Sequence, residues 1–90
     1  MNQRREVHYS GRVQGVGFRY TTSRIARGFS VSGFVENLSD GRVRLVVEAE
    51  KSELEGFLVA IADALGGNIS DVKTDNQVPN GEFSGFRIRT

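Results

Sequence analysis

The chain opens with an alternating apolar and polar pattern over residues 5 to 13, which predicts a half-buried strand. The positions on the inner face of this strand are Val7, Tyr9, Gly11 and Val13. Over residues 18 to 28 the spacing changes to three and four residues, which predicts an amphipathic helix. Its apolar face consists of Phe18, Thr22, Ile25 and Phe29. We expect Gly28 to end this helix in a left-handed conformation.

Two further strands and a second helix are predicted next. Residues 30 to 38 and 41 to 49 are joined by Ser39-Asp40-Gly41, and the Asp-Gly pair is a strong hairpin signal. Residues 52 to 65 have helical spacing, with Ser52 and Glu55 placed to form a capping box and Gly66-Gly67 placed to end the helix. The apolar stripe of this helix is Leu54, Phe57, Leu58, Ile61 and Leu65.

The rest of the chain predicts a weaker strand at residues 69 to 78, a turn at 79 to 81 and a last strand at 83 to 89. The order is β-α-β-β-α-β with a short terminal strand. Both helices have to bury their stripes on the same side of one antiparallel sheet. The pattern therefore predicts an α+β fold, a two-layer α/β sandwich, as a single domain over residues 1 to 90. This architecture supports many functions, so it does not identify one.

Composition narrows the class of protein. No apolar run is long enough to span a membrane, and a net charge of +1 is too small to indicate a nucleic-acid partner. The chain has no cysteine, which excludes disulfides, thiolate metal sites and a cysteinyl-phosphate intermediate. The polar first residues lead directly into a strand and do not form a secretory signal, so we expect a cytoplasmic protein.

The turn between the first strand and the first helix is the strongest candidate for a functional site. It reads Gly11-Arg12-Val13-Gln14-Gly15-Val16-Gly17-Phe18-Arg19. A glycine-rich turn that opens a helix can direct backbone N–H groups at an anion, and an arginine there adds a forked donor suited to phosphate. The same glycines also occur where only a tight turn is needed. Neither a Walker A ending nor a complete dinucleotide fingerprint is present.

This stretch resembles the first signature of the acylphosphatase family. Gly33-Phe34-Val35-Glu36-Asn37-Leu38-Ser39-Asp40-Gly41-Arg42-Val43 resembles the second, in the expected order and in a chain of the family's usual size. The resemblance implies a ferredoxin-like fold and hydrolysis of acyl phosphates to a carboxylate and inorganic phosphate, with no metal and no cofactor. Two positions depart from the family pattern, Glu36 before the asparagine and Ala49 in place of glycine, and we expect them to affect substrate preference more than activity.

The resemblance also implies the roles of the site residues. The phosphate-binding residues would be Gly15, Val16, Gly17, Phe18 and Arg19. Arg19 and Asn37 would be catalytic, Arg19 on the phosphoryl group and Asn37 on the attacking water. An amide suits that task because it offers donors and an acceptor without a charge that would repel an anion. Taken alone, an asparagine near a turn often serves only the local backbone.

Two other classes of function stay open at this point. A non-catalytic module of the same fold could use the cradle to bind phosphate or a phosphorylated partner. An RNA-binding domain would need exposed aromatic residues on the open sheet face, for which Tyr9 and Phe34 are the few candidates. We expect a monomer that acts on small acyl phosphates, is inhibited by inorganic phosphate or sulfate, and binds neither nucleic acid nor membrane. Gln14 is ambiguous and could brace the loop, and Asp40 is explained by the hairpin turn.

Overall fold

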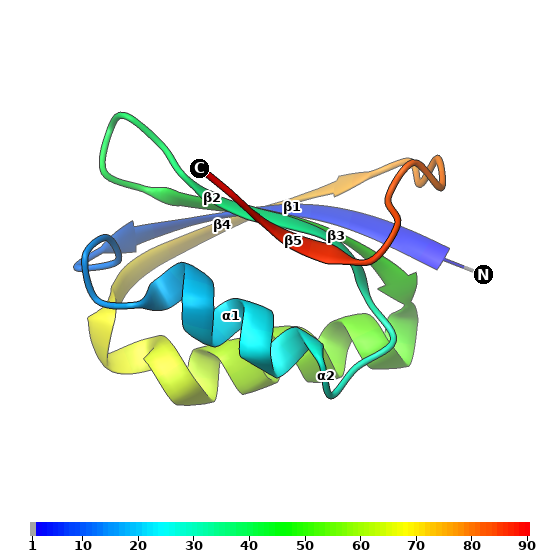
Figure 1. Ribbon diagram of the computed structural model, residues 1–90, viewed down its shortest axis with the longest axis horizontal. Coiled ribbons are helices and arrows are strands. Elements are labelled where there is room, and N and C mark those ends of the chain that lie inside the picture. The colour runs from blue at the N-terminus through cyan, green and yellow to red at the C-terminus, as the bar shows by residue number, and fades with distance from the viewer. Residues whose placement is uncertain (1) are drawn as a thin grey trace.

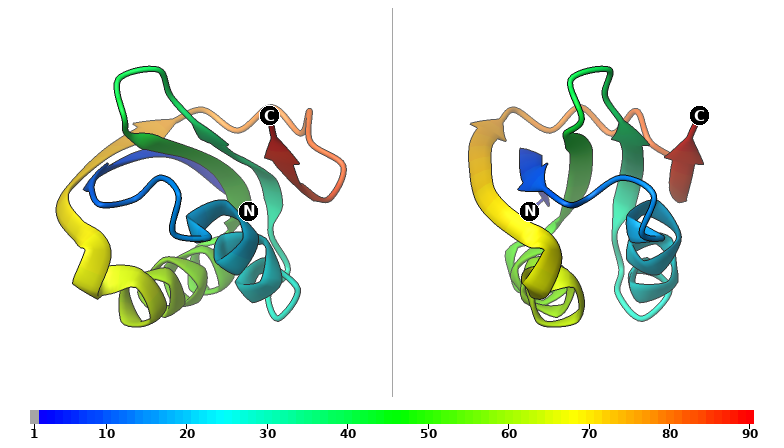
Figure 2. Two further views of the ribbon diagram at one scale, coloured as in Figure 1. Left: turned by 60° about the vertical axis from the view of Figure 1, so that its left-hand side comes forward. Right: turned by 90° about the vertical axis from the view of Figure 1, so that its left-hand side faces the viewer.

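The computed structural model describes residues 2–90 and consists of a five-stranded sheet with two helices on one face (Figure 1). The elements are β1 (Asn2–Gly11), α1 (Phe18–Ala26), β2 (Ser32–Asn37), β3 (Val43–Glu50), α2 (Lys51–Leu65), a short 3-10 helix (Gly66–Asn68), β4 (Ile69–Gln77) and β5 (Phe86–Arg89). Both helices lie on the same side of the sheet when the molecule is turned, as Figure 2 shows. The predicted α+β, two-layer ferredoxin-like fold is therefore confirmed.

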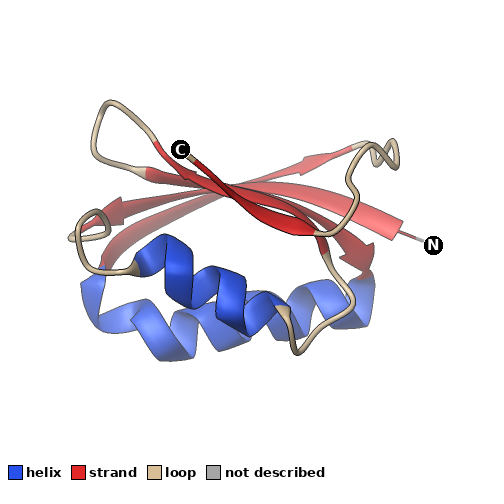
Figure 3. Ribbon diagram, viewed as in Figure 1, coloured by secondary structure: helices blue, strands red, loops and turns tan. Residues whose placement is uncertain are grey.

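The sheet, red in Figure 3, has the strand order β4-β1-β3-β2-β5 and is mixed. Strand β1 is antiparallel to β3 and β4, and β2 is antiparallel to β3, but β5 runs parallel to β2. The prediction of a wholly antiparallel sheet was wrong for this last strand. The reason is topological: β4 runs opposite to β2, so a chain that turns back after β4 has to enter the far edge in the direction of β2.

The core lies between the helices and the sheet, where the alternating strand positions meet the helical stripes. Its buried members include Val7, Tyr9, Val13, Phe18, Val35, Val43, Leu45, Val47, Leu54, Phe57, Ile61 and Leu65. The predicted stripe of α2 is confirmed, with Leu58 partly buried at its margin. By contrast, β4 is an edge strand with mostly exposed side chains, and Val78 beyond it is 85% exposed.

Two predicted helix ends differ from the structure. Helix α2 begins at Lys51, directly after β3, so Ser52 already lies inside the helix and forms no capping box with Glu55. No side chain within residues 2–90 caps this helix. Helix α1 ends at Ala26, and the next N–H groups bond to the carbonyls of Arg24 and Ile25 in a right-handed turn. The chain stays in the right-handed helical conformation through this turn, so Gly28 does not take the positive φ of the predicted left-handed conformation.

Candidate active site

The turn from β1 to α1 has the backbone geometry of an anion cradle. Gly15 and Gly17 have φ of 76° and 78°, the left-handed region that favours glycine, and Gly17 is the N-cap of α1. Apart from the glycine and its two chain neighbours, no atom of residues 2–90 lies within 4 Å of a Cβ built on either residue, so the backbone angle, not lack of space, requires glycine there. Among the residues that the structure describes, no side chain caps α1, and no acidic residue occupies its first turn. Its first N–H groups therefore lack an intrahelical partner, and the positive end of the helix dipole is uncompensated.

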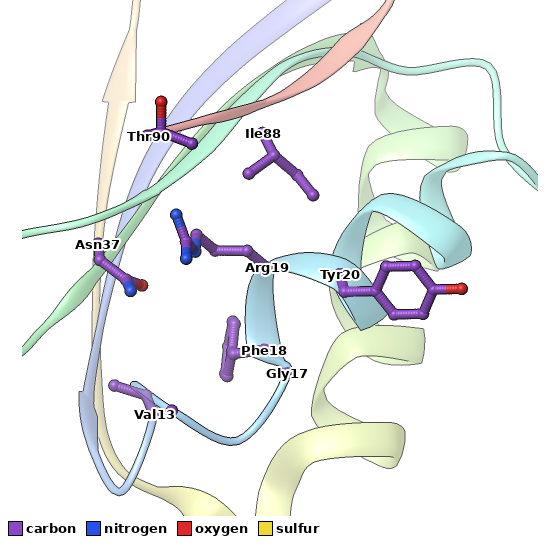
Figure 4. A pocket seen from close by; sticks show the side chains of 9 residues that line it. Val13, Gly17, Phe18, Arg19, Tyr20, Asn37, Ile88 and Thr90 are labelled. Atoms are coloured by element: carbon purple, nitrogen blue, oxygen red, sulfur yellow. The ribbon is translucent and has the colours of Figure 1, made fainter.

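A cavity of about 220 Å³ lies over this turn (Figure 4). Its lining residues are Val13, Gly15, Gly17, Phe18, Arg19, Tyr20, Asn37, Ile88 and Thr90. The structure thus brings five of the predicted site residues together, Asn37 from β2 with the others from the turn and α1. The exception is Val16, which does not line the cavity and has an exposed side chain. Sequence reasoning did not assign Tyr20, Ile88 or Thr90 to the site, since no motif marks them.

Arg19 reaches across the cavity from the first turn of α1. Its guanidinium and the amide of Asn37 point toward one another in Figure 4. The Nη1 atom donates a hydrogen bond to the backbone carbonyl of Arg89, at 3.2 Å. Among residues 2–90 no carboxylate forms an ion pair with Arg19. Its positive charge is therefore available to an anion in the cavity.

Gln14 holds the hairpin loop that carries Asn37. Its Nε2 donates to the carbonyls of Leu38 and Arg42 at 2.7 and 3.0 Å, so Gln14 ties the glycine-rich turn to the hairpin loop, a contact that the sequence did not predict. Asp40 serves the same loop: it accepts from the backbone N–H and the Nε of Arg42, at 3.1 and 2.8 Å. The backbone N–H of Arg42 is the main reason that the pKa of Asp40 is lowered. The Asn37 side chain makes no hydrogen bond to any of the residues described, so it is left free to bind solvent or ligand.

None of the nine lining residues has a carboxylate or an imidazole in its side chain. Tyr20 is 62% exposed, and Figure 4 shows its hydroxyl directed away from Arg19. Tyr9 lies beneath the site with its ring centroid 5.0 Å from that of Phe18, and burial raises the pKa of its phenol. The cavity therefore offers hydrogen-bond donors and one cationic side chain, Arg19, but no Asp, Glu or His side chain that could act as a general acid.

The two aromatic residues considered for RNA binding are both buried. Tyr9 faces the helices. Phe34 lies on the open face, but the Arg89 guanidinium covers its ring at 3.5 Å and the Phe83 ring lies 5.8 Å away. Neither ring is exposed for stacking on a base.

The two departures from the family pattern lie outside the cavity. Glu36 pairs with Arg44 at 3.0 Å on the open face, and Ala49 is buried in the core. Across residues 2–90 no group of three or more His, Asp or Glu side chains could hold a metal ion. In the same part of the chain, no helix has the length and apolar character needed to cross a membrane.

Comparison with known proteins identifies the family. The acylphosphatase family model matches residues 5–88. An acylphosphatase of Salinibacter ruber is 40% identical over 88 residues, covering 97% of this chain and 93% of the relative. An acylphosphatase of Archaeoglobus fulgidus is 50% identical over 56 residues, which cover 62% and 63% of the two chains. The crystal structure of the Bacillus subtilis acylphosphatase superposes with a TM-score of 0.85 at 29% identity, and all of both chains is covered. The chain therefore belongs to the acylphosphatase family and is a hydrolase that acts on acyl phosphates.

Proposed function

We propose that the chain cleaves acyl phosphates to a carboxylate and inorganic phosphate in the cavity between the β1–α1 turn and the end of β2. One observation carries this proposal. Arg19 and Asn37, which lie on different elements, face one another over the uncapped N-terminus of α1. This combination suits a reaction that needs an anion to be held and a water molecule to be placed beside it.

The chemistry of the substrate matches what the cavity contains. An acyl phosphate is a mixed anhydride, and its leaving group is a carboxylate that departs without a proton. The water oxygen forms a bond to phosphorus while the bond from phosphorus to the acyl oxygen breaks, and that electron pair leaves with the carboxylate. The substrate's own phosphoryl oxygen can take the water's proton. No general acid is required, in keeping with a lining that has none. A phosphate monoester has a poor alkoxide leaving group and should be a bad substrate.

Arg19 and the backbone are assigned to the phosphoryl group. The free N–H groups at the start of α1 and the positive end of its dipole favour a negative charge, and the Arg19 guanidinium adds a charge-assisted donor. We propose that the N–H groups of Gly15, Gly17 and Phe18 contribute with Arg19. Val16 was predicted to contribute as well; its N–H stays a candidate although the residue does not line the cavity.

Asn37 is assigned to the water. Its exposed amide lies at the end of β2 with no protein partner among the described residues, so it can accept from and donate to one water molecule. Because it is neutral, it does not repel the phosphoryl anion. A preorganised contact of this kind is worth about two to three orders of magnitude in turnover when it is removed from other hydrolases.

The proposal is tested by hydrolysis of benzoyl phosphate in the presence of a chelator, with benzyl phosphate, whose leaving group is an alkoxide, as the monoester comparison. We expect turnover of the acyl phosphate alone, without added metal, and competitive inhibition by phosphate and sulfate. Arg19→Ala should lower turnover by at least about a hundredfold and weaken phosphate inhibition. The matched control is Arg27→Ala, which removes the same charge from an exposed position just after the other end of α1.

Three outcomes would contradict the proposal. Equal effects of Arg19→Ala and Arg27→Ala on turnover and on phosphate inhibition would show that Arg19 is not part of the site. Activity that is lost in chelator and restored by magnesium would refute metal-independent hydrolysis. Phosphate binding at Arg19 without turnover of any acyl phosphate would instead identify a non-catalytic phosphate-binding module. Since one chain supplies all nine lining residues, we also propose that the monomer is active; the cytoplasmic location stays a prediction.

A further inference from the structure

The open face of the sheet holds a buried carboxylate far from the cavity. Glu48, on the central strand β3, has a side chain only 1% exposed to solvent. Its Oε2 accepts from Arg4 Nη1 at 3.0 Å and from the backbone N–H of Asn80 at 3.2 Å, and its Oε1 accepts from the backbone N–H of Gly81 at 3.1 Å. A buried carboxylate is strongly destabilising unless such partners satisfy it. Glu48 therefore ties the centre of the sheet to the segment that follows β4.

Arg4 holds the same segment from β1. It lies opposite Glu48 in the β1–β3 register, and its Nη1 also pairs with Glu82 at 2.6 Å. Its guanidinium carbon lies 4.9 Å from the centroid of the Phe83 ring. Glu48 and Arg4, called here the Arg4–Glu48 clasp, thus contact four consecutive residues of the segment 78 to 85.

This segment determines where β5 enters the sheet. At its end, the Gly85 carbonyl accepts from the Gly33 N–H of β2 at 3.0 Å, and β5 then pairs with β2 from Phe86 to Arg89. Strand β5 has four residues and lies at the sheet edge, and its main contact with the core is the Phe86 ring, 5.5 Å from Phe57. The segment before this short strand, held by the Arg4–Glu48 clasp, adds to the contacts that fix its position.

Strand β5 in turn completes the cavity. Its last residue, Arg89, presents the backbone carbonyl that accepts from Arg19 Nη1 at 3.2 Å. Ile88 and Thr90 from the same stretch line the cavity wall. A continuous series of contacts therefore runs from the Arg4–Glu48 clasp, through the segment 78 to 85 and β5, to the guanidinium on the opposite side of the sheet.

We propose that Arg4 and Glu48 are positioning residues for Arg19. The clasp fixes the segment 78 to 85, the segment fixes β5, and the Arg89 carbonyl then holds the Arg19 guanidinium in the orientation that meets the phosphoryl group. The inference rests on the proposed function, because it requires Arg19 to bind that group. Displacements of about 1 Å in such a group can cost up to about a hundredfold in rate.

The test compares Glu48→Gln with Glu36→Gln. Three groups donate to the Glu48 carboxylate: Arg4 Nη1 and the backbone N–H groups of Asn80 and Gly81. A glutamine there has one acceptor oxygen instead of two, and its NH₂ group, itself a donor, would face another donor. Glu36 is the matched control: it also pairs with an arginine on the open face, Arg44 at 3.0 Å, but it has no hydrogen bond or ion pair to the segment 78 to 85. Turnover of benzoyl phosphate and the inhibition constant of inorganic phosphate are measured per folded molecule, well below each melting temperature.

We expect Glu48→Gln to lower kcat and to raise the phosphate inhibition constant, each by about tenfold, with Glu36→Gln within about twofold of the native protein. In an Arg19→Ala background the Glu48→Gln change should have no further effect on phosphate inhibition, since no guanidinium is left to position. A purely structural role would give the same effect in both backgrounds. If Glu48→Gln does not fold, Glu82→Gln is measured instead, because it breaks the exposed ion pair with Arg4. It should lower kcat and raise the phosphate inhibition constant, each by about threefold.

The inference is overturned if Glu48→Gln and Glu36→Gln have equal kcat and equal phosphate inhibition constants. It is also overturned if Glu48→Gln weakens phosphate inhibition as much in the Arg19→Ala background as in the native protein. Both results leave the proposed function intact. A native protein that neither hydrolyses benzoyl phosphate nor is inhibited by phosphate would overturn the proposed function itself, and the inference with it. The two failures are therefore distinguishable in one set of measurements.

Discussion

Replacing Asn37 with alanine separates catalysis from stability. The side chain is exposed and has no hydrogen-bond partner within residues 2–90, so its removal leaves no protein group unpaired. The free energy of unfolding should therefore change by no more than about 0.5 kcal/mol. Turnover should fall by at least about a hundredfold, or about 2.7 kcal/mol of transition-state stabilisation. Phosphate inhibition should change little, because Arg19 and the backbone N–H groups remain.

Gln14→Ala is the complementary variant, because Gln14 and not Asn37 holds the loop. It removes the donor shared by the carbonyls of Leu38 and Arg42. Each carbonyl keeps a backbone partner, from Gly41 and Leu38 respectively, so neither is left unsatisfied. The expected loss of stability is therefore about 1 to 2 kcal/mol, and turnover per folded molecule should fall by less than in Asn37→Ala.

Urea unfolding, phosphate inhibition and turnover of benzoyl phosphate are measured on both variants. Asn37→Asp is added, and it should do no better than the alanine variant, because a carboxylate there would repel the phosphoryl anion at short range. Near-native turnover per folded molecule in Asn37→Ala would refute its assignment to the water. A stability loss above about 1 kcal/mol with modest kinetic effects would show that Asn37 is a turn residue after all.

Three further predictions concern the scaffold and its charges. Gly33→Ala should lower the free energy of unfolding by at least about 2 kcal/mol, because the new Cβ would lie 1.9 Å from the Val46 carbonyl oxygen at a φ of 146°. Gly41→Ala has a φ of 92° but lies in open space, so in the same urea titration it should lower this free energy by only about 1 kcal/mol. Phosphate at a hundred times its dissociation constant should stabilise the protein by about 2.7 kcal/mol in thermal melts, and no shift would show that it does not bind the native state. The pKa of Glu6 lies below its ordinary 4.5, mainly because Arg44 donates a hydrogen bond to its carboxylate. The contribution of this pair to the free energy of unfolding is therefore present above pH 4.5 and is lost as pH falls through the lowered pKa. Glu6→Gln should remove this part of the fall in stability at acid pH, worth less than about 1 kcal/mol, and an unchanged pH dependence would contradict the pairing.

The sequence by itself determined the parts of the protein that depend on near neighbours. The period of two before residue 11 and the period of three and four after residue 18 located β1 and α1, because strands and helices repeat their inward positions at those intervals. The positive φ angles at Gly15 and Gly17 follow from a turn that must reverse within a few residues. The two signatures placed Arg19 and Asn37 in one family pattern, and the structure lines one cavity with both.

Only the tertiary structure decided what depends on distant partners. No local pattern requires β5 to run parallel to β2, to bring Ile88 and Thr90 to the cavity, or to place the Arg89 carbonyl at Arg19, 70 positions earlier in the chain. Those contacts follow from the strand order and from the segment 78 to 85 held against the open face. The spacing of apolar residues indicates which side of a strand or helix is buried, but burying that side does not determine the direction in which the strand runs or its register. The register and direction of an edge strand are set by hydrogen bonds and side-chain partners that exist only once the sheet has formed.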